Sequence, residues 1–460
     1  MRSLADDLRT RGDDDLSALL LARPDLSRPL PADLSALAAR AATLPSIQRA
    51  VDALDAGDLA VLEALVVCGE PVDLARAAVL LGLSPARLRP RVDELWRRGL
   101  LWRGEEGTHL PRAVGEALGP HPAGLGPGPS DSPAIERAEE ALREIDAPAR
   151  ELLERLAWGP PVGTVSPTGP ASDIVAQLVQ AGLLERTAPD EVVLPRPAGL
   201  ALRGGRLHPD LRLDPPPLPT RELDQERADA AGGAAAADLL GLIDEVAGLW
   251  GPMPPRVLRA GGLAVADLKA TAQALDLDLD HAAFVIEIAY AAGLVDDDGE
   301  IEPVWAPTAS YDDWQQAGPE HRWLLLAQSW LRTTRAPSLV GRRPGRDERG
   351  AVNALSEAAS TALGRAVRHD ALALLASLPP GTAPQGATAA EPILARLRWS
   401  RPRRPAQAVA DLGAAALTEA AWLGMSGYGA LTTAGRLLAA DADPGEAAAA
   451  DSPSVRRDIV

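Results

Sequence analysis

The spacing of apolar positions predicts a mainly α-helical protein. Through most of the chain, apolar residues recur every three or four positions, as they do on one face of a helix. Short apolar pairs followed by polar turns interrupt this pattern and are typical of β-hairpins. Residues 1–44 are expected to form an N-terminal helical segment of two or three short helices. One of these begins after Asp33, a residue type that caps helix N-termini.

The clearest unit spans residues 45–118. Its last helix carries Leu88, Val92 and Leu95 at positions i, i+4 and i+7, which makes one buried stripe. Gly99 ends this helix, and the pieces LLWRG and GTHLP then predict two short strands around an acidic turn. Helix, turn, helix and hairpin in this order are the winged-helix order, so a winged-helix-like domain is expected here.

The same order returns twice along the chain. Gly182 and Gly293 each end a predicted helix, and an apolar pair, a polar turn and a second extended piece follow. We therefore expect a winged-helix-like domain in 134–203 and another, with an added C-terminal helix, in 235–336. In the former, a segment rich in proline and glycine replaces the middle helix, so that domain is degraded. The alternative is that any helix followed by glycine and a hairpin looks alike.

The remaining segments differ in composition. Residues 351–440 are expected to form a helical domain with an arginine-rich loop, and 441–460 a flexible tail rich in alanine and aspartate. Segments rich in proline and glycine at 119–133 and 204–233 indicate linkers. The predicted fold class is therefore mainly α, with tandem winged-helix-like units joined by helical segments.

Length and charge limit the possible partners. The chain has 460 residues, more than one hydrophobic core usually holds, so several domains are expected. Its net charge of −18 opposes DNA binding by the surface as a whole, so a nucleic-acid site must be a local basic patch. With one cysteine, Cys68, the chain cannot form a disulfide framework. It has no apolar N-terminal signal and no apolar run of about 20 residues, so we expect a cytoplasmic protein outside the membrane.

The sequence carries no recognisable catalytic or metal-binding motif. Lys269 lies in VADLKATA, without the glycines of a phosphate-binding P-loop, and no DExH/D pattern is present. The six histidines are scattered, with no Cys/His cluster of zinc-binding spacing. We therefore expect no enzyme activity, no cofactor and no metal.

The last helix of the 45–118 domain is the strongest candidate for DNA contact. Arg87, Arg91 and Arg98 lie on one face of it, beside the buried stripe. In a helix-turn-helix the second helix enters the major groove, and Arg103 in the following wing is placed to meet a phosphate. Pro90 is expected to kink or shorten the helix, which disfavours base reading. The alternative is that these arginines are simply solvated, since winged helices often serve protein contacts.

A second candidate is the segment RLRWSRPRRPAQ, which looks like a loop and contains no acidic residue. Its arginines are Arg396, Arg398, Arg401, Arg403 and Arg404. Trp399 is placed to stack on a base or on an arginine. A third basic segment covers 332–349. For both segments the alternative is a solvated linker.

Several long segments carry a family resemblance. They are LSALLLARPDLSRPL near the start, PEHRWLLLAQSWL, APSLVGRR, LLASLPPGTAP, ILARLRWSRPRR and EAAWLGMSGYGALTTAGRLLA. Together they resemble an actinobacterial helicase-associated family, named for its similarity to the XPB-type repair helicase. The resemblance covers most of residues 4–440 and is weakest across 119–235. It implies DNA association alongside repair or transcription, and it supplies no catalytic residues. Such proteins typically continue into a further XPB-like domain, which we expect to be missing here.

Two functions from different classes remain open at this stage. The favoured one is a non-catalytic, DNA-associated winged-helix protein, accessory to a helicase, repair or transcription complex. The other is a protein-interaction scaffold of stacked winged helices without DNA contact. They differ in whether the arginine patches stay exposed or are neutralised by acidic residues of the same protein.

Overall fold

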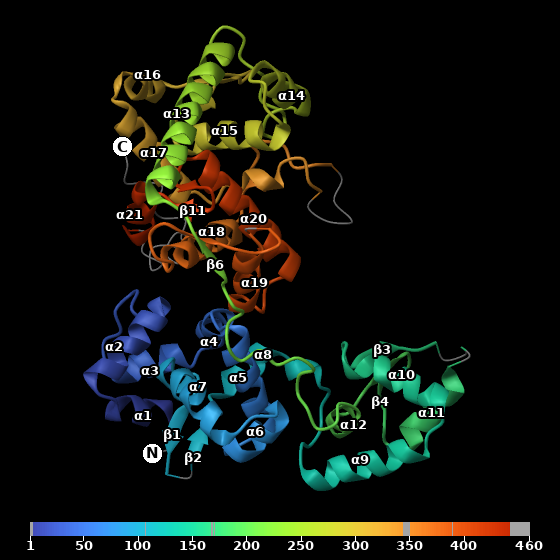
Figure 1. The fold of residues 1–460 in the computed structure, drawn as a ribbon. Helices are drawn as coiled ribbons and strands as arrows, with labels where there is room; N and C mark the ends of the chain where they lie inside the picture. Colours follow the sequence, from blue (N-terminus) through green and yellow to red (C-terminus); the bar gives the residue numbers. More distant parts are fainter. Residues whose placement is uncertain are drawn as a thin grey trace. The chain divides into compact units, whose positions relative to one another are not determined.

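A computed structural model describes residues 3–105, 107–166, 169, 171–343, 350–388 and 390–441. These residues are mainly helical, with 21 α-helices and a few small antiparallel sheets. The chain divides into two compact units (Figure 1). The first runs to residue 215 and takes in 400–403, and the second holds the other described residues. Among the described helices, none has the length and apolar character that a membrane crossing needs.

The first unit begins with three short helices and continues into two helix-and-hairpin groups. Its elements are α1 (Leu4–Thr10), α2 (Asp13–Ala22), α3 (Leu34–Ala41), α4 (Leu44–Asp52), α5 (Ala56–Cys68), α6 (Leu74–Leu81), α7 (Pro85–Arg97), β1 (Trp102–Gly104), β2 (Gly107–His109), α8 (Arg112–Leu118), α9 (Ser132–Glu144), α10 (Ala147–Ala157), β3 (Val162–Thr164), α11 (Ser172–Gln180), β4 (Glu185–Ala188), β5 (Glu191–Val193) and α12 (Arg196–Leu202).

The second unit is built on the long helix α13. Its elements are β6 (Thr220–Glu222), α13 (Gln225–Trp250), α14 (Val265–Ala274), α15 (Leu279–Ala291), β7 (Val295–Asp297), β8 (Trp305–Pro307), α16 (Ala309–Gln316), α17 (Pro319–Arg332), α18 (Ala362–Ala376), β9 (Thr382–Pro384), α19 (Glu391–Ser400), α20 (Ala406–Trp422), β10 (Ser426–Gly427), β11 (Ala430–Leu431) and α21 (Thr433–Asp441).

The helix predicted from the apolar stripe is present as α7. Leu88, Val92 and Leu95 are all buried, and the hairpin β1–β2 follows. The expectation that Pro90 shortens the helix is wrong, because α7 continues through it to Arg97. Burial of the apolar stripe outweighs the one backbone hydrogen bond that proline removes.

One helix ending precedes a hairpin at four glycines of the described residues. Gly99, Gly182, Gly293 and Gly424 follow α7, α11, α15 and α20, with φ of 67°, 71°, 72° and 78°. At each site, the glycine amide bonds to the carbonyl three residues back, and the next amide bonds to the carbonyl five residues back. This is the Schellman ending, which needs a left-handed residue that glycine adopts without strain. An antiparallel hairpin follows at these four sites, whereas the same ending at Gly82 and Gly204 is not followed by a hairpin.

The elements before these endings also repeat. The order is a helix, an extended segment, one or two helices and a hairpin, and it occurs in residues 56–109, 147–193, 225–307 and 362–431, which we call repeats one to four. In the first three, the extended segment bonds to the second hairpin strand. Val72 donates to the Thr108 carbonyl at 3.0 Å, β3 pairs with β5, and Arg256 bridges Val304.

The buried cores follow the repeats unevenly. Repeats one and two have separate hydrophobic clusters. A single cluster from Leu239 to Leu431 serves both repeat three and repeat four. Leu125 and Leu200, which flank repeat two in sequence, both belong to the cluster of repeat one. The chain therefore leaves the core of repeat one before repeat two and returns to that core after it.

Candidate nucleic-acid interface

Arg87 and Arg91, in the first half of α7, both contact acidic residues of the first unit. Arg87 pairs with Asp214 at 2.9 Å, and both side chains are more than half exposed, at 57% and 69%. Arg91 is only 22% exposed and donates to Asp58 at 2.8 Å and to Asp55 at 3.1 Å. The second terminal nitrogen of Arg91 donates to the Leu213 carbonyl at 2.8 Å. Both terminal nitrogens of Arg91 are therefore already bonded within the protein.

Arg98 and Arg103, the other two predicted residues, are also paired. Arg98 donates to Glu94, one helical turn earlier, at 2.9 Å. Arg103, on strand β1, pairs with Asp93 and stacks over the Trp96 ring, 4.2 Å from its centroid. The structure thus keeps the four arginines on or beside α7, and each has a carboxylate partner.

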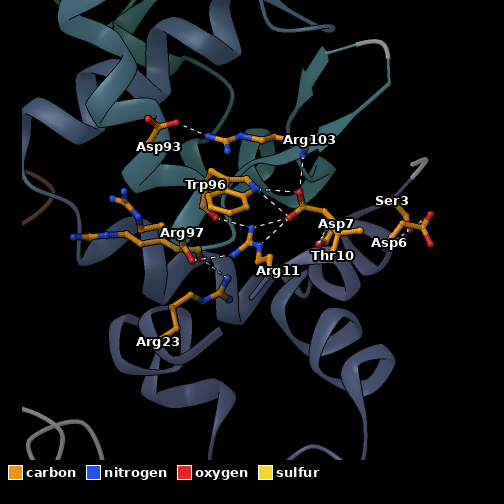
Figure 2. A network of polar contacts seen from close by, with 11 residues as sticks. Ser3, Asp6, Asp7, Thr10, Arg11, Arg23, Asp93, Trp96, Arg97 and Arg103 are labelled. Atoms are coloured by element: carbon orange, nitrogen blue, oxygen red, sulfur yellow. Dashed lines mark hydrogen bonds and ion pairs between the residues drawn. The ribbon is translucent and has the colours of Figure 1, made fainter. Parts of the chain in front are cut away.

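A network around Asp7 joins α1 to the end of α7 (Figure 2). Asp7 is buried and accepts from the Arg11 side chain at 2.9 Å, the Trp96 indole at 3.0 Å and the Arg103 amide at 3.0 Å. Arg11 also donates to the carbonyls of Trp96 and Arg97, which end α7. The Trp96 ring lies between the guanidinium groups of Arg11 and Arg103. Burial lowers the pKa of Arg11, and Asp7 opposes this shift.

Directly opposite its buried stripe α7 carries one cation, and the exposed Arg87 and Arg89 lie on its flanks. With 3.6 residues per turn, Ala86, Pro90, Asp93 and Arg97 lie opposite the buried stripe. Arg97, the one cation among them, pairs with Glu94 at 3.2 Å. A winged helix that reads DNA presents this side of its second helix to the major groove. Here that side offers a proline and an acid where base-reading cations are expected.

The second arginine cluster is divided between a helix and a turn. The expectation of a loop is wrong for Arg396 and Arg398, because α19 continues to Ser400 with Leu397 buried. The contacts of the cluster are Arg396 with the Pro216 carbonyl at 2.8 Å, Arg398 with Glu391 at 2.8 Å, and Arg403 with Asp52 at 2.9 Å and the Ala117 carbonyl at 3.1 Å. Arg401 and Arg404 also have interaction partners. Of the third basic segment, residues 344–349 lie outside the described residues.

Sequence analysis missed a buried ionic cluster in the second unit. Glu287 on α15 accepts a hydrogen bond from a terminal nitrogen of Arg335 at 3.0 Å and another from the Leu355 amide at 2.7 Å. Glu419 on α20 accepts from the Trp330 indole at 2.7 Å and lies 3.5 Å from Arg368. Burial raises the pKa of both carboxyls, and the arginines oppose this shift.

The ionic cluster joins several elements and borders a cavity of only about 10 Å³. Each carboxylate bonds to partners from other elements, and the side chains of Glu287 and Glu419 are nearly inaccessible to solvent. The sequence signal was an acid inside the apolar run FVIEIAY, which marks a buried charge that needs a partner. In the part of the chain that the structure describes, no group of three or more histidine, cysteine or acidic side chains is arranged to hold a metal ion.

No protein-family model matches the chain, and no curated protein or solved structure matches it either.

Proposed function

We propose that this chain is a non-catalytic protein-interaction scaffold of four tandem winged-helix-like units, working in a helicase, repair or transcription assembly. The repeated order of elements supports the winged-helix-like description, because the extended segment, the helices and the hairpin follow the order of that motif. The sequence resemblance to helicase-associated proteins supports the setting.

The proposal rests on one helix of each repeat, the second helix of the motif, which is the helix that enters the groove in a DNA-binding winged helix. In each repeat we consider its charge, its ion pairs and its burial. On α7, the predicted arginines bond to carboxylates of the same unit. On α11, the exposed positions include Asp173 and Gln177, and the helix has no cation. On α15, residues 282–289 are all buried, and 7 of the 17 residues of α20 are buried. Helices that are ion-paired, lack a cation or are buried in this way are suited to packing and protein contacts, and not to entry into a DNA groove.

DNA binding through α7 is the second candidate, and one observation favours it. The Arg87–Asp214 pair is largely exposed, and exposed ion pairs contribute only about 0–1 kcal/mol. A DNA phosphate can therefore replace Asp214 at little cost. Arg91 is less available, because it is bonded to the buried Asp58.

A titration of fluorescent duplex DNA at two salt concentrations tests the choice. For the scaffold, we expect binding weaker than the ~10⁻⁴–10⁻⁶ M of ordinary non-specific DNA binders at physiological salt. Saturable binding in or below that range overturns the scaffold proposal. So does a log K against log salt slope of roughly −3 to −5, which corresponds to about four to six phosphate contacts.

Matched variants identify the element that makes any such contact. R87Q/R103Q removes two exposed cations beside α7, and R137Q/R155Q removes two exposed cations on α9 and α10. Arg91 stays intact, because its loss leaves the buried Asp58 unpaired. If α7 binds DNA, the first pair weakens binding more than the second. Equal effects would instead indicate a general charge effect. ATP hydrolysis above background contradicts the non-catalytic part of the proposal.

A further inference from the structure

Two neighbouring cavities lie within the second unit. The first has a volume of about 310 Å³ and is lined by the starts of α14 and α15 and by residues 340–342 and 352–354. The second has a volume of about 300 Å³ and is lined mainly by residues 338–343 and by the first turns of α20. Because Arg342 and Val352 line both cavities, we treat the two as one feature and call it the α14–α20 groove.

The groove has an apolar floor and an apolar rim. Leu263 and Leu268 are 1% and 5% exposed and form the floor of the first cavity, and Leu412, 8% exposed, lies at the floor of the second. Val265 and Leu279, the first residues of α14 and α15, are 46% and 43% exposed and form the rim of the first cavity. Half-exposed aliphatic side chains around an apolar hollow are typical of a surface that another molecule covers.

Backbone hydrogen bonds hold the wall between the two cavities. The Gly341 amide donates to the Val352 carbonyl, and the Val352 amide donates to the Arg342 carbonyl, both at 2.8 Å. The Arg342 side chain pairs with Asp411 on α20 at 3.2 Å. The shape of the groove is therefore set by contacts within the second unit before any partner binds.

The two cavities carry opposite charges. Asp280 lines the first cavity, and Arg343 lines the second. Both residues are exposed, and neither forms an ion pair within the part of the chain that the structure describes. A bound partner is therefore favoured when it brings a base to Asp280 and an acid to Arg343, because complementary charges fix the orientation of binding.

These features fit a helix of another protein better than a small molecule. A small-molecule site encloses most of its ligand, whereas the rim residues Val265 and Leu279 are nearly half exposed here. An amphipathic helix presents apolar side chains at i, i+3, i+4 and i+7 along one face and polar side chains beside them. Two adjoining apolar cavities with an acid beside one and a base beside the other match that pattern.

We propose that the α14–α20 groove binds one amphipathic helix of a partner protein, with an apolar side chain in each cavity, a base beside Asp280 and an acid beside Arg343. The inference rests on the proposed scaffold function and gives the class of partner that the second unit recruits.

A displayed library of helices about four turns long tests this proposal on the full chain. The library fixes large apolar residues at i, i+4 and i+7 and randomises the other positions. We expect the selected helices to carry acids toward one end of the apolar stripe and bases toward the other. Selected helices are then synthesised with a fluorescent label, and their affinity is measured by anisotropy.

Two variants block the groove by different means. Val265→Glu puts a charge on the apolar rim, at a helix start where glutamate is tolerated, and Ala408→Trp fills the second cavity. Each should weaken binding at least about tenfold, as expected when a central apolar anchor is lost. The matched controls are Ile301→Glu, at a position that is 99% exposed, and Ala406→Trp, at an exposed position of α20, and both should leave binding unchanged.

A further pair of variants tests the charge pattern. Arg343→Glu should reverse the preference at its end of the helix from an acid to a base, whereas Arg259→Glu, at another exposed arginine, should not. Circular dichroism confirms that each variant is folded.

Three results overturn the proposal. The first is a library that yields no helix weakened by Val265→Glu and Ala408→Trp. The second is a set of selected helices without the pattern of acid and base. The third is self-association of the wild-type chain in sedimentation that Val265→Glu abolishes, because the occupant is then a second copy of this chain. The selection contains no DNA, so this proposal and the scaffold proposal can fail separately.

Discussion

Asp7 is the residue whose loss should most damage the first unit. It is 2% exposed, and its carboxylate accepts from Arg11, Trp96 and the amide of Arg103. The Arg11 side chain is itself 0% exposed. Asp7→Ala therefore leaves a buried cation without its counter-charge, together with an indole and an amide without an acceptor.

The magnitude follows from the kind of pair that is broken. Removing one partner of a buried ion pair typically costs about 3–5 kcal/mol, because the remaining charge stays desolvated. With a urea m-value of about 2 kcal/mol/M, this cost lowers the unfolding midpoint of the first unit by about 2 M. Asp6→Ala is the matched control. Asp6 is 39% exposed and pairs with Arg9 at the surface, so its loss should cost about 0–1 kcal/mol.

The assay must report on one unit, because a chain with two units need not unfold in one step. Hydrogen exchange in increasing urea, read on peptides from α1 and α7, isolates the relevant unfolding. Asp7→Ala combined with Arg11→Met should recover part of the loss, since the unpaired charge is then gone. Equal midpoints for the Asp7 and Asp6 variants, or strictly additive costs in the double variant, refute the reasoning.

Three further predictions concern the glycine endings, the thiol and the histidines. Gly293→Ala should lower the free energy of unfolding by about 1–2 kcal/mol, because alanine is strained in the left-handed conformation. Gly424→Ala should lower it by a further ~1–3 kcal/mol, because its Cβ would also lie 2.3 Å from a carbonyl oxygen of α13. Equal melting temperatures of the two variants contradict this expectation. Burial raises the pKa of Cys68 to about 11, so at pH 8 its thiolate fraction should be about 100-fold smaller than that of a thiol of pKa 9.0. Because a thiolate of higher pKa is more nucleophilic, the native thiol should react with a disulfide reagent about tenfold more slowly, and unfolding in urea should remove the difference. Burial lowers the pKa of His281 and His369 below 6.5, so the folded protein favours the neutral form of both imidazoles. Their contribution to the free energy of unfolding is therefore complete above pH 6.5 and declines as the pH falls below it. Melting of the full chain from pH 7.5 to 5.5 should show this loss, and His369→Gln should reduce it.

Local sequence patterns were enough to predict the helical part of the fold. The stripe on α7, its glycine ending and the short hairpin all follow from residues within one turn or strand of each other. Repeat four escaped notice because each strand of its hairpin has only two residues. Its alanine-rich α20 also lacks the strong polar contrast that marks an amphipathic helix.

The candidate site illustrates what spacing cannot supply. Helical periodicity placed Arg87 and Arg91 together correctly, but their partners come from elsewhere in the chain. Asp214 lies 127 positions from Arg87, and Leu213 lies 122 positions from Arg91. Whether a basic cluster is an open surface or half of an internal network depends on such long-range contacts. Whether these arginines are exposed or neutralised is therefore decided by residues more than 100 positions away in the sequence.

The placement of repeat two has a consequence for how this chain can be rearranged. Its two ends, near Leu125 and Leu200, return to one core, while its own apolar residues form a separate cluster. A module connected in this way can be excised, exchanged or lengthened without opening the host core, as in proteins that carry an inserted domain. Repeats three and four are different, because they share one core and must be inherited together. Variation in domain content among relatives of this chain should therefore concentrate in the second repeat.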